Sequence, residues 1–327
     1  APPASSVGAA PQLIVHAQLH LQLGEDEGAA AGATSPRDAE ALELLYDLGE
    51  PLGSGHFSTV RRASCRTTGR MVAVKSARSD AGGGAEAVRA LSREAAVLRA
   101  LGTHPHVCEL LDVFESVRPA KRGVWGGGRP VRELHLVLEL MRGGELFDAL
   151  VAQTRFSEAR AKREVRVVLR AVAHMHARGV LHRDLKVENL LYADEACSLL
   201  KVSDFGLSTR AAAHLALEHT GCGTAGYAAP EILLRRPYDG KVDVFAAGVI
   251  AYVLLSGTEP FTGDNDVQTA EQTCAGRLDF DGDEWADVSD EAMDFVTRCL
   301  AVEPSERPTA AEALQLPWLR DEGGQPS

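Results

Sequence analysis

The pattern of apolar residues changes near residue 141, and this change constrains the fold more than any other feature. Before it, short segments rich in β-forming residues lie among glycines, at Leu52–Val60, Met71–Val74 and Leu134–Leu140. After it, apolar residues recur with the spacing of helices. The segments with this helical spacing are 145–152, 158–179, 242–256 and 289–300. The sequence therefore predicts an α+β fold with two lobes, one small and mainly β, the other larger and α-rich.

One helix is predicted inside the small lobe, and it carries an acid on its apolar side. Within Ala87–Leu101, the spacing of Leu91, Glu94 and Leu98 places them on one face. A carboxylate that is buried in this way needs a partner for its charge. We therefore expect Glu94 to lie inside the protein beside such a partner.

The predicted boundaries follow changes in composition. Residues 44–142 form the small lobe, 143–320 the large lobe and 321–327 a tail. Residues 1–43 are an N-terminal extension rich in Ala, Pro, Gly and Ser, which predicts a tethered and poorly ordered arm. Inside it, residues 13–23 alternate between apolar and polar as an edge strand does. That segment fits either the tail of an upstream domain or an added strand.

Composition argues against several kinds of partner. A formal net charge of −12 and an isoelectric point near 5.4 disfavour binding to nucleic acid or to an anionic membrane, because both need a basic surface. No apolar run reaches the ~18 residues of a membrane span, so no membrane insertion is expected. The six cysteines show no paired spacing, which predicts reduced thiols and no zinc site. These features favour a cytoplasmic location and are compatible with a nuclear one.

A glycine-rich loop followed by a lysine predicts nucleotide binding. Gly53 and Gly55 lie within Leu52–Val60, and Lys75 ends the apolar segment Val72–Lys75. Glycines let the backbone approach phosphates closely, and a lysine on a neighbouring strand supplies a positive charge for them. The alternative is a solvated strand lysine, which fits less well because the residues before Lys75 are apolar.

The strongest motif lies between residues 182 and 206. His182–Leu191 reads HRDLKVENLL, and Lys201–Gly206 reads KVSDFG. With these motifs in this order and at this separation, the sequence resembles the eukaryotic protein kinase family. Further matches to that family are Ala229-Pro230-Glu231, Asp243 and Arg307. The resemblance implies the bilobal protein kinase fold, with a small mainly β N-lobe and a larger α-rich C-lobe.

Within this family, the sequence is most similar to the calcium/calmodulin-dependent protein kinase group. The matching phrases are Gly143–Asp148, Asp204–Ser208, Val253–Gly257 and Ala313–Leu319. Lys186, two residues after Asp184, is typical of serine/threonine kinases. The departures from the family pattern are Ser58, Ala225 and Phe245, and none of them removes a catalytic group.

The resemblance implies the cofactors ATP and Mg²⁺ and assigns a role to each matched residue. Lys75 holds the α and β phosphates and is fixed by Glu94. Lys186 meets the transferring phosphoryl group, and Asp184 accepts or orients the substrate hydroxyl. An ordinary aspartate with a pKa of ~3.9 is a weak base, so orientation is the larger part of that expected role. The implied metal ligands are Asn189 and Asp204.

The implied nucleotide site draws on both lobes. Val60 and Ala73 lie above the adenine ring and Leu191 below it, while backbone groups of Glu139 and Met141 read its edge. The residues that the resemblance assigns to the nucleotide are Leu52, Gly53, Gly55, Val60, Ala73, Lys75, Glu139, Met141, Glu145 and Leu191.

The resemblance also implies protein substrates and a switch. Glu145 and Glu188 lie where related kinases hold the ribose and basic residues upstream of the phosphoacceptor, so substrates with such residues are expected. The alternative is that both are ordinary surface glutamates. Thr220 is expected to be a phosphorylation switch whose phosphate is received by Arg183.

Two other functions fit parts of this pattern. A pseudokinase scaffold would bind ATP without transfer, but every catalytic residue is present. A small-molecule kinase of similar architecture would lack the Ala229-Pro230-Glu231 and Arg307 elements.

One acidic segment has the spacing of the start of an EF-hand loop, at Asp279, Asp281 and Asp283. Glu284 stands where that loop needs glycine, so we interpret the segment as an acidic turn. Regulation by calcium or calmodulin is left open.

Overall fold

The computed structural model describes residues 37–38, 40–54, 58–79, 84–118, 130–210 and 225–320. These residues fall into two compact units, each of which is described by itself. The first is drawn from Thr34–Ser92 and Leu111–Leu140, and the second from Arg93–Leu110 and the chain from Met141 onward. The edge strand expected at 13–23, Gly55, Thr220 and the expected tail lie outside the described residues.

A six-stranded sheet forms the first unit. Its strands are β1 (Arg37–Asp38), β2 (Tyr46–Ser54), β3 (Ser58–Cys65), β4 (Met71–Arg78), β5 (Leu110–Arg118) and β6 (Val131–Glu139). They are ordered β1-β5-β6-β4-β3-β2. β1 runs parallel to β5, whereas β2, β3, β4 and β6 pair antiparallel. The β-rich segments predicted from the sequence correspond to β2 and β3, to β4 and to β6.

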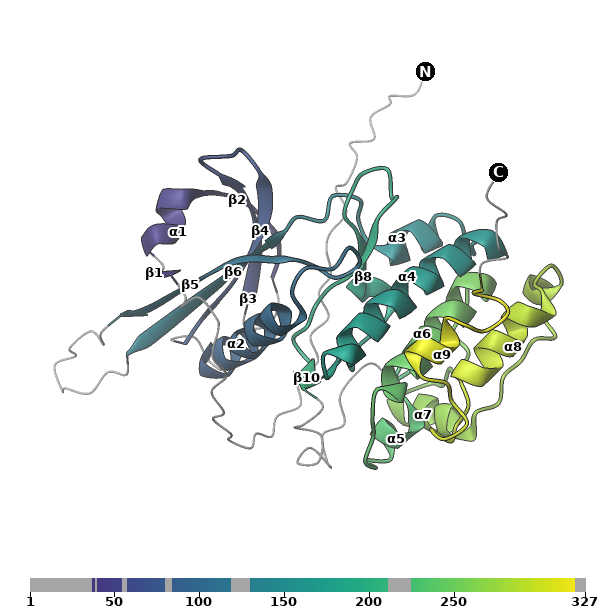
Figure 1. Cartoon of the computed structure of the whole chain (residues 1–327). Coiled ribbons are helices and arrows are strands. Elements are labelled where there is room, and N and C mark those ends of the chain that lie inside the picture. The colour runs from purple at the N-terminus through teal and green to yellow at the C-terminus, as the bar shows by residue number, and fades with distance from the viewer. Residues whose placement is uncertain are drawn as a thin grey trace, which may run out of the picture. The chain divides into compact units, whose positions relative to one another are not determined.

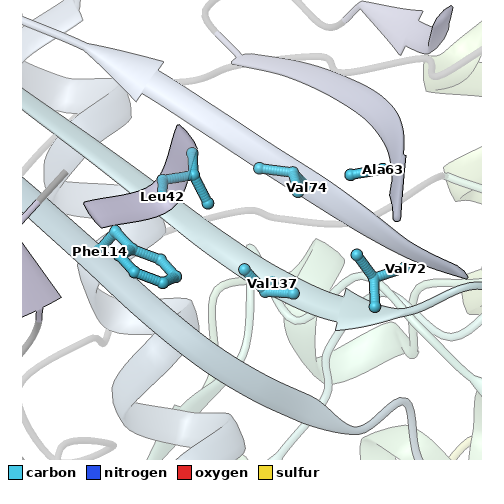
Figure 2. Packing of buried hydrophobic residues seen from close by; sticks show 6 residues of the cluster. All are labelled: Leu42, Ala63, Val72, Val74, Phe114 and Val137. Atoms are coloured by element: carbon cyan, nitrogen blue, oxygen red, sulfur yellow. The ribbon is translucent and has the colours of Figure 1, made fainter. Parts of the chain in front are cut away.

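A short helix that the sequence did not predict contributes to the core of this sheet. Helix α1 (Glu40–Leu45) carries Leu42, which is 2% exposed and clusters with Val74, Phe114 and Val137 (Figure 2). Ala63 and Val72 complete the cluster. The last residues of the arm that the sequence predicted to be poorly ordered, 40–43, are therefore helical, and Leu42 among them is buried.

We expect Leu42→Ala to lower the free energy of unfolding of this unit by about 2–5 kcal/mol, because truncation leaves a cavity among tightly packed side chains. Leu44 on the same helix is 76% exposed. Leu44→Ala is therefore the matched control and should change the free energy of unfolding by no more than about 0.5 kcal/mol. Urea unfolding of both variants measures the difference. Equal stability of the two would show that α1 does not dock on the sheet.

The second unit is mainly helical, as predicted. Helix α2 (Gly84–Leu101) begins in the first unit and ends in the second. The other helices are α3 (Leu146–Val151), α4 (Glu158–Ala177), α5 (Pro230–Leu233), α6 (Lys241–Ser256), α7 (Asp266–Ala275), α8 (Asp290–Cys299) and α9 (Ala310–Ala313). Short 3₁₀ turns lie at Val187–Asn189 and Asp283–Trp285. Two small sheets pair β7 (Val180–Leu181) with β10 (Thr209–Arg210), and β8 (Leu190–Tyr192) with β9 (Leu200–Val202).

Helix α6 lies at the centre of the second unit. Every residue from Val242 to Ser256 is buried, in agreement with the dense apolar segment in the sequence. Helices α4, α8 and α9 all pack against it (Figure 1). Because α6 is buried, the polar side chain of Asp243 in its first turn is held in the interior, where it needs partners. None of the helices in the described ranges is long and apolar enough to cross a membrane.

Candidate active site

Three residues assigned to the nucleotide share one face of the sheet in the first unit. Gly53 pairs with Val60 across β2 and β3, and Val60 pairs with Lys75 across β3 and β4. Ala73 lies two residues before Lys75 and therefore points to the same face. The residues that alternate with Ala73 and Lys75 along β4 point to the opposite face, where the Leu42 cluster lies. The sheet thus separates its core from a face that carries Val60, Ala73 and Lys75.

The other assigned residues of the first unit lie along the same strands. Leu52 and Gly53 belong to β2, and Glu139 is the last residue of β6, where it pairs with Val72. Lys75 is half-buried, which disfavours the alternative of a fully solvated strand lysine. The nucleotide-binding roles of these residues stay predictions.

In the second unit, Asp243 holds the loop that carries Asp184. Its Oδ2 accepts a hydrogen bond from the His182 N–H at 3.0 Å, and its Oδ1 accepts one from the Arg183 N–H at 2.8 Å. His176 Nε2 lies 2.8 Å from the same Oδ2. Burial opposes ionisation of Asp243, but the hydrogen bond and charge of His176 hold its pKa below the usual value. These bonds stabilise Arg183 at a φ of 69°, a conformation that non-glycine residues rarely adopt.

Two of the predicted site residues lie next to the carboxylate of Asp184. Asn189 Nδ2 donates to the Asp184 backbone carbonyl at 2.7 Å and to Oδ2 at 3.2 Å. Lys186 Nζ lies 3.8 Å from the same Oδ2. Burial raises the pKa of Asp184 above its usual value; Lys186 and His182 oppose this shift, and Asp204 adds to it. Asp184 is therefore a stronger base than the ordinary aspartate assumed from the sequence.

The segment that ends in Asp204 is tied to the same loop. The N–H and the hydroxyl of Ser203 both donate to the Asn189 carbonyl at 2.9 Å. His182 Nε2 lies 3.0 Å from the Ser203 carbonyl oxygen. Phe205 is 1% exposed and packs edge-on against the His182 ring. These contacts place the backbone of Asp204 beside Asn189.

The donor set at this point suits Mg²⁺. Asp204 offers a carboxylate. Asn189 offers its amide oxygen, because its Nδ2 is already bound to Asp184. Mg²⁺ prefers oxygen ligands and usually takes only one or two carboxylates from a protein, with phosphates and water completing its shell. Asp204 and Asn189 therefore each fit as a ligand of a Mg²⁺ ion whose remaining ligands are phosphate oxygens of a nucleotide and water, Asp204 for the first ion and Asn189 for the second.

Glu145 and Leu191 come together although they are distant in the sequence. An isolated β-bridge joins their backbones. Glu145 is half-buried, and its pKa is raised to about 7, first by burial and then by Asp148 and Glu188, while Lys186 opposes the shift. Its expected role toward the ribose or a basic substrate residue stays a prediction.

The remaining predicted residues of the second unit are Glu94, Met141 and Arg183. Glu94 is 3% exposed, as its position on the apolar side of α2 predicted, whereas its pairing with Lys75 stays a prediction. Met141 is half-buried. The Arg183 guanidinium donates from Nε to the Leu207 carbonyl at 2.8 Å and from Nη1 to the Tyr238 hydroxyl at 3.0 Å. Sequence reasoning missed Tyr238, because nothing in its neighbourhood marks it as a partner of Arg183.

Comparison with known proteins agrees with the motifs. A family model described as the protein kinase domain matches residues 46–319. Human serine/threonine-protein kinase H1 is 40% identical over 276 residues, which cover 84% of this chain and 61% of that protein. The zebrafish (Danio rerio) serine/threonine-protein kinase H1 homolog gives the same identity and coverage. Rat calcium/calmodulin-dependent protein kinase type 1B is 40% identical over 284 residues, 86% of this chain and 77% of that protein. The chain thus spans 61% of the length of its H1 relatives.

Proposed function

The chain belongs to the protein kinase domain family, and from this premise we propose that it transfers the γ-phosphate of Mg-ATP to serine and threonine hydroxyls of proteins. The observation that carries this proposal is the joining of Asp184, Asn189 and the Asp204 segment by hydrogen bonds in one loop system. A scaffold that only binds ATP would not need this arrangement around Asp184. The pseudokinase alternative is therefore disfavoured.

Four residues of this chain have distinct proposed roles in phosphoryl transfer. Asp184 orients the substrate hydroxyl and accepts its proton, a task that its raised pKa assists. Lys186, held beside it, meets the negative charge of the phosphoryl group. Asp204 and Asn189 are the proposed Mg²⁺ ligands. Bound Mg²⁺ would neutralise the charge on the phosphates.

The proposed nucleotide site uses the residues predicted from the sequence. Lys75 would bind the α and β phosphates, and Glu94 would fix its position. Val60, Ala73 and Leu191 would enclose the adenine ring, and the backbone at Glu139 and Met141 would read its edge. Leu52, Gly53 and Gly55 would cover the phosphates.

The test of this proposal is transfer of labelled γ-phosphate from ATP to serine and threonine peptides, with and without Mg²⁺. We expect Mg²⁺-dependent incorporation into peptides. ATP binding without transfer to any peptide would support the pseudokinase alternative instead. Transfer to a small aminoglycoside or alcohol but to no peptide would support the small-molecule kinase.

We also propose that substrates carry basic residues upstream of the phosphoacceptor, held in part by Glu145. Because the pKa of Glu145 is about 7, this carboxyl group is charged above that pH and neutral below it. The preference for a basic peptide over a neutral one should therefore grow as the pH rises through about 7. The ratio of the two kcat/KM values, measured between about pH 6 and about pH 8 in the wild type and in Glu145→Gln, checks this. An equally pH-dependent ratio in the variant would contradict the role of Glu145.

Thr220 stays proposed as a phosphorylation switch. The hydrogen bonds of Arg183 to Leu207 and Tyr238 occupy part of its guanidinium group. Guanidinium carries further N–H donors, so a phosphate on Thr220 would use those or displace the Tyr238 hydroxyl. Dependence on calcium or calmodulin is part of the name of the type 1B relatives from rat and mouse and is left open for this chain.

A further inference from the structure

Helix α4 carries a row of basic residues on its exposed side. Arg163, Arg166, Arg170, His174 and Arg178, the last being the C-cap residue, follow one another at intervals of three or four residues. This spacing places them on one face of the helix. Three of them, Arg163, Arg170 and Arg178, are exposed, and the other two are half-buried. These five residues are the basic stripe, and none of them belongs to the proposed active site.

The acidic residues of α4 are turned away from the solvent side of the helix. Glu158 Oε1 accepts hydrogen bonds from the Ser289 hydroxyl at 2.7 Å and from Trp318 Nε1 at 3.0 Å. Glu164 is 3% exposed and is reached by Arg163 Nη2 at 3.2 Å. Both carboxylates therefore take part in packing within the unit.

The second half of the stripe has no acidic partner. Among the described residues, Arg170, His174 and Arg178 form no ion pair with a carboxylate, and Arg178 Nη1 lies 3.1 Å from His174 Nδ1. A helix face that serves only for solvation usually alternates acids and bases three or four residues apart. In the whole chain, acids outnumber Lys and Arg by 46 to 34. A stripe without acids is therefore unexpected from composition.

The loop between α2 and β5 adds imidazoles beside this part of the stripe. The His104 ring lies against His174, with 4.2 Å between the ring centroids, and His106 lies 5.6 Å from His104. Burial, followed by the charges of His174, His106, Arg178 and Lys201, lowers the pKa of His104 to about 4. Every one of these charges is positive. The surface here has a positive potential in a protein of net charge −12.

Stabilisation of the helix end does not explain the stripe. Cations interact favourably with the helix dipole near the C-terminus, and this effect falls off within the last turn. Arg163, Arg166 and Arg170 lie before the last turn of α4, which ends at Ala177. Like charges four residues apart, as at Arg166 and Arg170, lower the stability of a helix. A bound anion would remove this repulsion.

The dimensions of the stripe indicate which kind of anion fits. Residues four apart in a helix are separated by about 6 Å along its axis. Side chains two apart in an extended peptide point to the same side and are about 6.6 Å apart. From Arg163 to Arg178 the stripe is about 22 Å long, which corresponds to about seven extended residues. A single inorganic anion would contact only a small part of it.

We propose that the basic stripe binds an extended acidic segment of a partner protein, with glutamate or aspartate at alternate positions. Arginine suits this ligand because its planar guanidinium can donate two parallel hydrogen bonds to one carboxylate. The net charge of −12 disfavours a long polyanion such as nucleic acid or an anionic membrane, whereas a short segment meets only the local charge. The inference does not depend on phosphate transfer.

Binding of a short peptide, followed by fluorescence anisotropy, tests this inference. The probe has seven residues, with glutamate at every odd position and serine between, and carries a neutral dye. The wild type should bind it and should not bind the same peptide with glutamine in place of glutamate. Arg170→Gln combined with Arg178→Gln should raise the dissociation constant by roughly tenfold, because two exposed ion pairs are lost.

Arg235→Gln combined with Arg277→Gln is the matched control, because it removes the same charge from exposed positions outside α4. It should keep the wild-type dissociation constant, and thermal unfolding should show that both double variants are folded. Equal weakening in the two double variants, or no binding to the wild type, would overturn the proposal. A single-stranded oligonucleotide or a phosphatidylserine vesicle that binds more tightly than the peptide, and does so through Arg170 and Arg178, would also overturn it.

Discussion

Asp184→Asn is expected to lower the rate of Mg²⁺-dependent phosphate transfer by at least ~10²–10⁴-fold, the usual contribution of a positioned acid or base. Asparagine has nearly the same shape, so it can keep the hydrogen bond from Asn189. It cannot accept the proton of the substrate hydroxyl, and it removes the negative charge that holds Lys186 at 3.8 Å. The variant should therefore bind ATP and fold normally but transfer phosphate poorly.

Steady-state transfer to a peptide, together with thermal unfolding and ATP binding, separates these effects. Asp264→Asn is a suitable control, because Asp264 is exposed on the loop after α6. The control should retain the wild-type rate. If Asp184→Asn transfers phosphate as fast as the wild type, Asp184 is not the catalytic residue and the assignment of the whole loop is wrong.

Arg307→Leu is expected to lower the free energy of unfolding by about 3–5 kcal/mol, because it breaks a buried ion pair. The Arg307 side chain is 0% exposed and donates from Nη1 to Glu231 Oε1 at 2.8 Å. The same guanidinium donates to the carbonyl oxygens of Lys241 and Ala301 and lies over the ring of Phe245. Leucine would leave the Glu231 carboxylate, itself only 3% exposed, without its cation.

Chemical denaturation of Glu231→Gln, of its combination with Arg307→Leu, and of Arg298→Leu isolates the cause. Glu231→Gln combined with Arg307→Leu should lose less stability than the sum of the single changes, because no uncompensated charge is then buried. Arg298→Leu removes an exposed arginine that pairs with Asp294, and it should cost less than about 1 kcal/mol. If Arg307→Leu costs no more than Arg298→Leu, the buried pair does not stabilise the second unit.

The candidate catalytic residues could be proposed from the sequence because they lie in short contiguous motifs. Asp184, Asn189 and Asp204 sit close enough along the chain that their order and spacing identify them. The division into a β-rich and an α-rich part was also predictable, since the period of apolar residues reports which side of an element is buried. The same reasoning predicted the burial of Glu94, and this prediction is confirmed.

Helix α1 could not be predicted in this way. It has six residues, too few to show a helical period or to be stable alone. Leu42 is buried only because Phe114 and Val137, from strands much later in the chain, provide a surface for it. The information that stabilises α1 therefore lies outside the segment that forms it.

The sequence by itself determined which chemical groups the protein has and which of them are joined by local spacing. Only the tertiary structure decided how those groups are charged. Glu145 and Glu259 lie far from Glu188 in the sequence. The fold partly buries both side chains and brings the Glu188 carboxylate near them, so their pKa values rise. Such shifts depend on desolvation and on distances between segments far apart in the chain. Both are set by the packing of the whole unit, and no local pattern of residues contains them.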